Sequence, residues 1–328
     1  MKKSILVTIV VLTLSLVMAR VALADGGPHG GYTSTTDACA GCHRAHTAIG
    51  PRLLMDNSTY DLCISCHGNA GTGADSNVLD GIWLEGRNPT DTTGDLQTAI
   101  NANLLGGGFN NYGAAPVTSS HDPTDTQVDA WGYGVARGAL AALSGANPLS
   151  CASCHDPHGS PNYRIIPETV NGVAVAVALV DEGAAKDYDD EQWGAGTSAF
   201  CAACHDDYHQ TAANQGSTLD GASYTHRINM PWDGDAGTDP YIGMGGGNPE
   251  TVGFDDDGAG PNPTFYLPLA ESGVNDTLVC MTCHLPHGSS AEMIGNADGA
   301  GLPGETSATD SALLRLDNRG VCQVCHQK

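Results

Sequence analysis

Every cysteine of this chain belongs to one short pattern. The 328-residue sequence contains 12 cysteines, which form six C-x-x-C pairs, and a histidine directly follows each pair. The pairs are Cys39 with Cys42, Cys63 with Cys66, Cys151 with Cys154, Cys201 with Cys204, Cys280 with Cys283, and Cys322 with Cys325. The histidines that follow them are His43, His67, His155, His205, His284 and His326. Each pair spans about one helical turn, so the pattern predicts six compact groups of two thiols and one imidazole.

These groups are typical of covalent haem attachment. Two thiols one helical turn apart can add to the vinyl groups of neighbouring rings on one haem, while the adjacent histidine turns its imidazole onto the iron. A structural zinc site groups two C-x-x-C units and does not require a histidine after each pair. Disulfides in an exported protein also leave the histidines unexplained. We therefore expect six haem c groups, with the cysteines as thioether attachment points and the adjacent histidines as proximal iron ligands.

In three of the motifs a second histidine follows three residues after the first. These histidines are His46 in CAGCHRAH, His158 in CASCHDPH and His287 in CMTCHLPH. Three residues of extended chain reach only about 10 Å. This distance is too short to pass around the edge of the porphyrin and return to its other face. Each of these histidines is therefore expected to ligate the iron of a neighbouring haem.

The remaining histidines supply the other distal ligands. Removing the six proximal histidines from the total of 13 leaves seven candidates: His29, His46, His121, His158, His209, His226 and His287. Six irons need six distal ligands, so one histidine is spare. We expect the spare to be His29, in the glycine-rich segment DGGPHGGY, although a flexible arm could also deliver it to another subunit. A surface position is the alternative for His209, and only the count supports His121 and His226.

Methionine is the competing distal ligand and would raise the reduction potential. Outside the N-terminal segment and the attachment motifs the chain has Met55, Met230, Met244 and Met293. We interpret them as packing or loop residues. The sequence thus predicts low-spin irons of low potential, each held between two histidines.

The N-terminal segment has the features of a signal peptide. Residues 1–24 contain two lysines, an apolar run and Ala22-Leu23-Ala24, which fits the small-x-small rule for cleavage. We expect an exported mature chain, residues 25–328, without a membrane span, and an uncleaved N-terminal anchor is the alternative. Cleavage removes three basic residues and no acidic one, which leaves a net charge of −27. Such an acidic surface repels nucleic acid, so we expect no nucleic-acid partner.

The six motifs form three tandem pairs. In each pair the first member carries the second histidine, and an apolar linker separates the two members: Arg52–Leu54, Tyr163–Ile166 and Leu313–Leu316. This repeat predicts one hexahaem unit built from three haem-pair modules, at about 29–75, 145–210 and 275–328. Two insertions, at about 76–150 and 211–274, carry His121 and His226.

The composition does not favour a large apolar core. The chain has 43 glycines and 17 prolines, and aromatic residues make up only 5% of it. We predict mostly irregular coil with short α-helices and little β structure, wrapped around haems that form the core. Short helices are expected at 94–105 and 135–143, and Asn171-Gly172 predicts a hairpin between 165–170 and 173–180.

Three acidic clusters, at 187–191, 233–239 and 255–257, raise the question of cation binding. The segment DGDAGTDPYIGM begins like a calcium loop, but Met244 stands where the bidentate glutamate is required, so an EF-hand is rejected. An irregularly bound calcium ion is a candidate cofactor. A solvated charged surface is the simpler interpretation.

The paired motifs resemble those of the doubled C-x-x-C-H family of multihaem cytochromes. The segments CAGCHRAH…RLL…LCISCHG, CASCHDPHGSPNYRII and CMTCHLPHGSS carry the resemblance. Among such proteins the chain is most similar in haem number, export signal and coil-rich composition to extracellular cytochromes that form filaments. The resemblance implies subunits stacked head to tail, with a distal histidine donated across the interface, for which His46 is the candidate. It also implies upstream redox cytochromes and extracellular electron acceptors as partners.

Three functions are compatible with these motifs. The preferred one is long-range electron transfer as a filament subunit outside the cell or at its surface. A discrete periplasmic or surface electron carrier is the alternative. A multihaem reductase is less favoured, because such an enzyme keeps one iron with an open axial site, often through an altered motif, and none of the six motifs is altered.

Overall fold

The computed structural model describes a little over half of the chain. The described residues are 29, 38–68, 74–85, 99–130, 138–139, 143–180, 193–208, 218–219, 223–224, 226, 228–231, 267–271, 277–293, 311–318 and 320–325. The expected signal peptide and the three acidic clusters lie outside these ranges, as do His209 and His326. Within them, no helix has the length and apolar character needed to cross a membrane.

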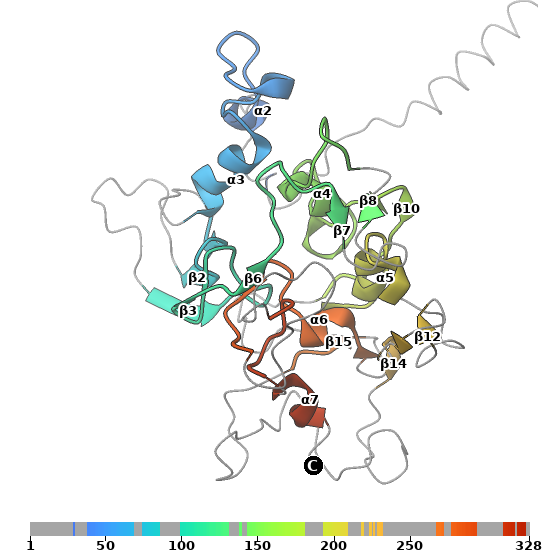
Figure 1. The fold of residues 1–328 in the computed structure, drawn as a ribbon. Helices are drawn as coiled ribbons and strands as arrows, with labels where there is room; N and C mark the ends of the chain where they lie inside the picture. The colour runs from blue at the N-terminus through green and yellow to red at the C-terminus, as the bar shows by residue number, and fades with distance from the viewer. Residues whose placement is uncertain are drawn as a thin grey trace, which may run out of the picture.

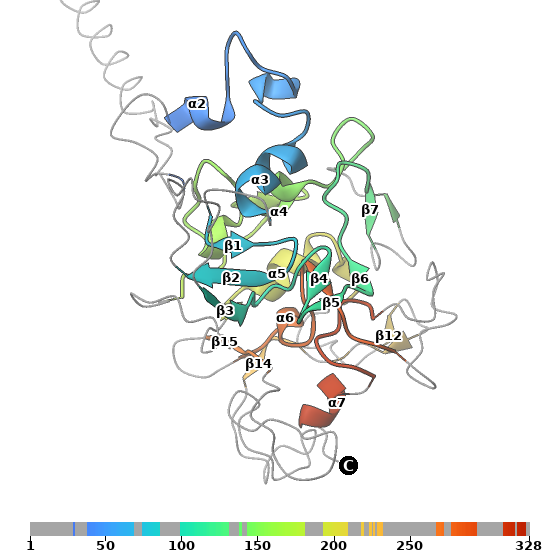
Figure 2. The same cartoon turned by 90° about the vertical axis from the view of Figure 1, so that its left-hand side faces the viewer.

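The helices are short, and each α-helix contains cysteines of one C-x-x-C motif. They are α2 (Ala38–Cys42), α3 (Thr59–His67), α4 (Cys151–Cys154), α5 (Thr197–Ala202), α6 (Cys280–Cys283) and α7 (Gly320–Cys325), with 3-10 turns η2 (Pro51–Leu53), η3 (Tyr163–Ile165) and η4 (Asp206–Tyr208). In both views the α-helices follow one another in chain order, from α2 at the top to α7 at the bottom (Figures 1 and 2). The attachment motifs are thus spread along the length of the molecule.

The strands are brief and form small separate sheets. They are β1 (Ser76–Asn77), β2 (Ile82–Glu85), β3 (Ala99–Asn103), β4 (Asn111–Tyr112), β5 (Ala115–Pro116), β6 (Ser119–Ser120), β7 (Asp129–Ala130), β8 (Gly138–Ala139), β9 (Thr169–Val170), β10 (Val173–Ala174), β11 (Trp193–Gly194), β12 (Thr218–Leu219), β13 (Ser223–Tyr224), β14 (Met230–Pro231), β15 (Ala270–Glu271), β16 (Thr277–Leu278) and β17 (Gly288–Ser289). The larger sheets have the orders β1-β2-β3 and β11-β15-β16-β14. This architecture confirms the expected fold class of irregular chain with short helices and little β structure.

Both helices expected in the first insertion are wrong for the described residues. Ala99–Asn103 forms strand β3, which pairs antiparallel with β2, whose residues Ile82, Trp83 and Leu84 favour a strand. Gly138–Ala139 forms β8, which pairs antiparallel with β7. In both segments a neighbouring strand supplies backbone partners, and this tertiary pairing outweighs the local helical pattern. Residues 94–98 lie outside the described part of the chain.

The hairpin expected at Asn171-Gly172 is confirmed. Strands β9 and β10 pair antiparallel, with Val170 opposite Val173. Asn171 and Gly172 have φ values of 47° and 77°, and positive φ at both central residues is what a two-residue hairpin loop requires.

The three apolar linkers share an unusual backbone. Each contains two consecutive residues with positive φ: Arg52 and Leu53, Arg164 and Ile165, and Ala312 and Leu313. Left-handed backbone is unfavourable for residues with a Cβ atom, so its occurrence at the same place three times indicates a common structural requirement. In each linker the second of these residues accepts a backbone hydrogen bond from the residue after a proximal histidine, at 2.9 Å for Arg44, 2.7 Å for Asp156 and 2.8 Å for Leu285.

The apolar core is small and includes attachment cysteines. Its main cluster contains Tyr163, Ile166, Trp193, Val279 and Met281, with Cys201 and Cys204 packed against it. A second cluster of Leu267 and Val321 packs against Cys283. Because thiols of the motifs line these clusters, groups attached to them would extend the same core.

The buried side chain of Asn162 makes several hydrogen bonds to the backbone beside this core, and its removal should destabilise the protein. The side-chain amide donates to the carbonyls of Ile166 at 3.0 Å and Val175 at 3.2 Å, and its oxygen accepts from the N–H of Val177 at 2.9 Å. Asn162→Ala removes these bonds from the Val175 carbonyl and the Val177 N–H, whereas the Ile166 carbonyl keeps its bond from the Ser160 hydroxyl, so we expect the free energy of unfolding to fall by about 2–4 kcal/mol. Guanidinium titration followed by tryptophan fluorescence measures the change. Asn57→Ala, at an exposed side chain, is the control, and equal midpoints for the two variants would contradict the expectation.

Candidate functional site

The attachment motifs form tight helical turns. In four of them the N–H of the proximal histidine donates to the carbonyl of the first cysteine, at 2.7 Å for His43, 3.0 Å for His155 and His205, and 3.1 Å for His284. In α4 and α6 a hydroxyl also caps the turn: Ser153 Oγ accepts from the N–H of Ser150, and Thr282 Oγ1 from that of Val279, both at 3.1 Å. The two sulfur atoms of each turn and the following imidazole therefore belong to one rigid unit.

The predicted attachment cysteines differ in their exposure. Within the part of the chain whose burial the structure describes, these cysteines are free thiols. The exposed ones are Cys39, Cys42 and Cys322, and the half-buried ones are Cys63, Cys66, Cys151, Cys154, Cys201, Cys204, Cys280 and Cys283. Cys325 ends α7. Their role as thioether attachment points stays a prediction.

Cys66 departs from the pattern of the other second cysteines. Helices α2, α4 and α6 end at the second cysteine of their motifs, whereas α3 continues through Cys66 to His67. The Cys66 Sγ accepts a hydrogen bond from Ser65 Oγ at 3.9 Å, and the Nδ1 of His67 contacts Ser76 Oγ at 2.9 Å. The N-cap Ser58 starts this helix early, so its nine residues enclose the whole motif. The six groups are therefore not all alike, and a thioether at Cys66 requires its sulfur to give up the contact with Ser65.

The first histidine of each module is held by the left-handed linker that follows it. The Nδ1–H of His43 donates to the carbonyl of Arg52 at 3.0 Å, that of His155 to Arg164 at 2.8 Å, and that of His284 to Ala312 at 2.9 Å. A metal-binding histidine commonly makes such a bond with the ring nitrogen that does not bind the metal. The bond directs Nε2 away from the linker and leaves it available for an iron atom.

Sequence reasoning missed these carbonyl acceptors. Each lies on the first left-handed residue of its linker, so the strained backbone turns a carbonyl toward the imidazole. The equal spacing from His43 to Arg52 and from His155 to Arg164 was the available signal. The spacing from His284 to Ala312 is much longer, which hides the relation in the third module.

Four proximal histidines each face a second histidine from another part of the chain. The ring centroids are 6.2 Å apart for His43 and His158, 6.1 Å for His67 and His29, 6.3 Å for His155 and His287, and 6.1 Å for His205 and His121. Two metal–nitrogen bonds of about 2.0 Å, with roughly 1 Å from each nitrogen to its ring centre, give a separation close to 6 Å. The paired rings therefore have the spacing of two axial ligands on one iron, and these residues fit a haem.

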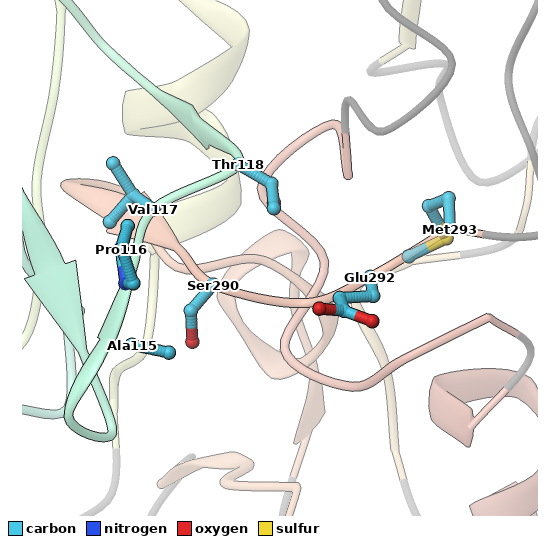
Figure 3. A pocket seen from close by; sticks show the side chains of 7 residues that line it. All are labelled: Ala115, Pro116, Val117, Thr118, Ser290, Glu292 and Met293. Atoms are coloured by element: carbon cyan, nitrogen blue, oxygen red, sulfur yellow. The ribbon is translucent and has the colours of Figure 1, made fainter.

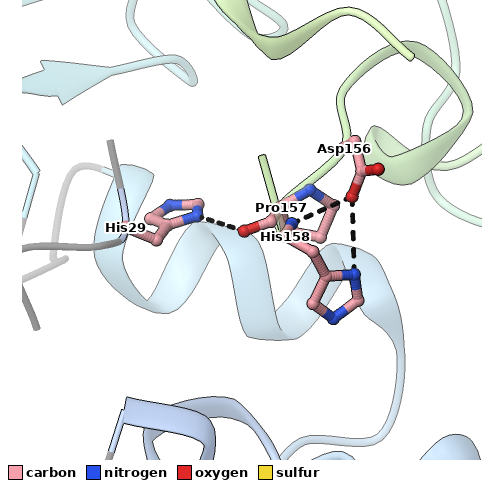
Figure 4. Close-up of polar contacts among 4 residues, drawn as sticks. All are labelled: His29, Asp156, Pro157 and His158. Carbon is pink, nitrogen blue, oxygen red and sulfur yellow. Dashed lines mark hydrogen bonds and ion pairs between the residues drawn. The ribbon is translucent and has the colours of Figure 1, made fainter. Parts of the chain in front are cut away.

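Figure 4 shows how residues 156–158 organise two of these pairs. The Nδ1–H of His29 donates to the carbonyl of Pro157 at 3.0 Å, and the N–H of His158 donates to Asp156 Oδ1 at 2.9 Å. The segment after α4 thus holds His29 toward His67 and presents His158 to His43. The expectation that His29 is the spare histidine does not fit this arrangement, because the spacing of its ring to His67 matches that of the other pairs.

Burial keeps several of these imidazoles neutral. Desolvation lowers the pKa of His121, His155 and His284. Burial, followed by the neighbouring His155, lowers the pKa of His287 to about 3. A neutral imidazole is the form that binds a metal. Burial also raises the pKa of Cys154 to about 12, so this thiol is protonated in the free chain.

The thiols of the first module lie near one another. Partial desolvation raises the pKa of Cys42, and the neighbouring thiols of Cys63, Cys66 and Cys39 raise it further. Cys63 and Cys66 belong to the second motif, so their electrostatic effect on Cys42 requires the two motifs to be close. The first and second attachment sites are therefore neighbours in space as well as in sequence.

Cysteines of successive modules lie near one another. The interaction between Cys63 of the second motif and Cys151 of the third raises the pKa of Cys63 and lowers that of Cys151. The interaction between Cys201 of the fourth motif and Cys280 of the fifth likewise raises the pKa of Cys201 and lowers that of Cys280. Helix α3 contacts α4, and α5 contacts α6. The second motif of one module therefore adjoins the first motif of the next.

Comparison with known proteins agrees with this geometry. The family described as "Doubled CXXCH motif" matches residues 29–72, which include His29 and the first two attachment motifs. Over these residues the chain is similar to proteins with the doubled C-x-x-C-H motif. It is 25% identical over 289 residues to the C-type cytochrome OmcS of Geobacter sulfurreducens, a match that covers 65% of this chain and 64% of OmcS. The chain thus spans slightly less than two thirds of that relative.

A solved structure was also found to be similar. The Outer Membrane Cytochrome S Filament from Geobacter sulfurreducens covers 88% of this chain and 98% of its own, with 18% identity and a TM-score of 0.40. This TM-score is too low for the likeness to carry an argument. The assignment of the cytochrome rests on its motifs, their geometry and the sequence matches.

Two histidines of the cytochrome have no opposing ring among the described residues. His46 is exposed in the loop after α2, and His284 is anchored to Ala312 but faces no second imidazole. His226 is exposed. His209 and His326 lie outside the described ranges, so the structure places neither of them.

The cytochrome also has a hollow between two stretches of backbone, residues 115–118 and 290–293 (Figure 3). Glu292 and Met293 contribute its largest side chains, and no cysteine or histidine lines it. It therefore belongs to none of the haem attachment sites.

Removing a distal histidine should open one axial position. In His158→Ala we expect all covalent haems to remain, because thioether attachment does not involve this residue, and one iron to become high-spin. Electron paramagnetic resonance of the oxidised protein measures the high-spin fraction. Asp156→Asn is the matched control, since it changes the carboxylate beside His158 and keeps the imidazole. A wholly low-spin spectrum for His158→Ala would rule out the His43–His158 pair.

The assignment of His29 has a separate test. His29→Ala should also produce one high-spin iron, because the structure places its ring opposite His67. If His29 is spare, as the sequence alone suggested, the spectrum stays unchanged. Thr35→Ala, in the same N-terminal stretch, serves as the control.

Proposed function

We propose that this cytochrome carries electrons along six haems, each held between two histidines, and that it is the repeating subunit of an extracellular filament. The observation that carries the proposal is that the described histidine pairs follow a repeating rule. In the described pairs the second histidine of a module faces the preceding module. For His46, which lies in the first module, such a partner exists only in a second copy of the chain.

The rule for the first haem of each module follows from two pairs. His158 of the second module faces His43 of the first, and His287 of the third module faces His155 of the second. Each second histidine therefore reaches back by one module. His46 occupies this position in the first module and has no preceding module within its own chain. In the third module the proximal histidine is the residue without a partner, because His284 faces no described ring.

The second haem of each module follows another rule. His29 lies before the first module's motifs and faces His67, and His121 lies in the insertion before the second module and faces His205. The corresponding residue of the third module is His226, which we assign to His326. All six irons then have two histidines, and His209 becomes the spare. This is the surface position considered for His209 from the sequence.

Donation of His46 to His284 of the next copy gives a head-to-tail contact. The donor lies beside α2 and the acceptor follows α6, and these helices are well separated along the molecule (Figure 1). A contact between two different surfaces of the chain adds copies head to tail. Unless the rotation between successive copies closes a ring, such a contact produces an open filament.

The neighbouring cysteines support a continuous electron path. Cys63 lies near Cys151, and Cys201 lies near Cys280, on helices that contact each other, so haems attached there would meet at the module boundaries. Within the first module, Cys42 lies near the thiols of the second motif. We therefore propose that the haems follow one another in the order of their motifs. Upstream cytochromes would supply electrons, and extracellular acceptors would receive them.

A discrete electron carrier at the cell surface or in the periplasm is the second candidate. The same six motifs would serve it, and exposed His46 would then be a surface residue. A reductase is less favoured, because the described pairs, together with the proposed assignment of His226 to His326, leave only the His284 iron without a partner inside the chain.

Loss of the interface histidine separates these candidates. We expect His46→Ala to retain every covalent haem and to form no filaments in negative-stain electron microscopy, whereas the wild type forms thin filaments with a regular repeat. Arg44→Gln is the control, because Arg44 lies in the same exposed loop and the described hydrogen bond of its side chain runs from Nε to the nearby Ala40 carbonyl. Filaments in His46→Ala would refute the interface assignment, and single particles in the wild type would favour the discrete carrier.

A further inference from the structure

Arg315 is a half-buried cation that has no carboxylate partner among the described residues. Its Nε donates to the carbonyl of Met281 at 3.0 Å, and Nη2 donates to the carbonyl of Leu105 at 2.9 Å. No aspartate or glutamate within the described ranges forms an ion pair with it. Burial lowers the pKa of Arg315 to about 10, so the group remains charged at neutral pH. A charge in such a place costs free energy unless an anion compensates it.

The surroundings of Arg315 also contain an unused donor. The guanidinium lies over the Trp193 ring, with Cζ 5.7 Å from its centroid. Trp193 is only 5% exposed, and its indole Nε1 has no hydrogen-bond partner among the described residues. An indole N–H can only donate, and a guanidinium carries five N–H groups, of which two are used here. The site therefore has a surplus of donors and a positive charge, which together fit a carboxylate.

The position of the site indicates where that carboxylate comes from. Arg315 lies in the third linker, and its backbone N–H donates to the carbonyl of Cys283 at 3.0 Å. Trp193 belongs to the core cluster against which Cys201 and Cys204 pack. The site thus lies between the fourth and fifth attachment motifs. Each haem carries two propionate carboxylates, so haems attached here would bring anions to this place.

We propose that Arg315, assisted by the indole N–H of Trp193, binds a haem propionate and thereby raises the reduction potential of that haem. The inference rests on haem attachment as proposed above. Oxidised haem carries one more positive charge than reduced haem, so a nearby cation disfavours the oxidised state. Arginine suits this role because its planar fork matches a carboxylate and keeps its charge in a low-dielectric setting.

The position of Arg315 is particular to the third module. In the other linkers the equivalent residues are Met55 and Pro167, which carry no charge. The backbone N–H of Met55 donates to the Cys42 carbonyl at 3.0 Å, as that of Arg315 does to Cys283, so the linker itself does not require an arginine. The positive charge of Arg315 is therefore a feature of the third module that the backbone of the repeat does not require.

Redox titration of the haem-loaded protein tests the proposal. In Arg315→Gln we expect one of the one-electron steps to move to lower potential, by an amount that changes the ratio of oxidised to reduced haem roughly tenfold at fixed potential. Trp193→Phe should give a smaller shift in the same direction. Arg315→Lys keeps the charge and should restore most of the wild-type potential. Arg44→Gln removes an exposed, solvent-screened charge and should leave every step unchanged.

These variants also distinguish a structural role from a propionate site. If Arg315 only bridges the carbonyls of Met281 and Leu105, lysine cannot reproduce the fork, and Arg315→Lys shifts the potential as Arg315→Gln does. That result, or an unchanged titration of Arg315→Gln, overturns the proposal. Haem content, measured as the pyridine haemochrome, is determined for every variant. Full haem content with unchanged potentials would refute the role of Arg315 alone, whereas lack of covalent haem in the wild type would refute the proposed function.

The source of the anion is read from a cryo-electron microscopy map of the haem-loaded wild type. A propionate within hydrogen-bond distance of the guanidinium supports the proposal and identifies its haem as the one attached at Cys201/Cys204 or at Cys280/Cys283. An aspartate or glutamate side chain in that place would refute it.

Discussion

The opposed histidine pairs are the interaction on which the rest of the structure depends. Each pair joins an imidazole fixed beside its cysteines to one carried by a distant segment, with the separation that a shared metal requires. The second histidine lies only three residues after the proximal one, and this short spacing determines which module it can reach. The His158 ring lies opposite His43 of the preceding module, and the His287 ring lies opposite His155. The far face of a haem attached at its own motif would be beyond the reach of each of these histidines. These pairs therefore link the modules to one another instead of closing each on itself.

The left-handed linkers serve this arrangement. A proximal imidazole must present Nε2 in a defined direction, and a carbonyl on Nδ1 provides that orientation. The linkers adopt an unfavourable backbone conformation at two consecutive residues to deliver this carbonyl and a backbone hydrogen bond to the residue after the histidine. The second linker shows which part of the motif is essential. Pro167 cannot donate the N–H that Met55 and Arg315 donate, yet His155 retains its bond to the Arg164 carbonyl.

The polypeptide contributes little apolar core of its own. Tyr163, Trp193 and a few aliphatic side chains form the main cluster, and cysteines of the fourth motif pack directly against it. Strands of two residues and helices of one or two turns would be marginal without further support. Haems attached at these cysteines would supply the apolar mass that such a chain needs to become ordered. This explains how a glycine-rich sequence with long insertions can still position its ligands closely.

The sequence predicted features that depend on neighbouring residues better than contacts between distant segments. The attachment turns, the short reach of His46, His158 and His287, and the Asn171-Gly172 hairpin depend on residues close together in the chain, and the sequence by itself determined them. The strand at Ala99–Asn103, the opposition of His29 to His67 and the placement of Arg315 over Trp193 depend on segments brought together from far apart. Only the tertiary structure decided these, because each contact joins residues far apart in the sequence, and no local pattern predicts which distant segments meet.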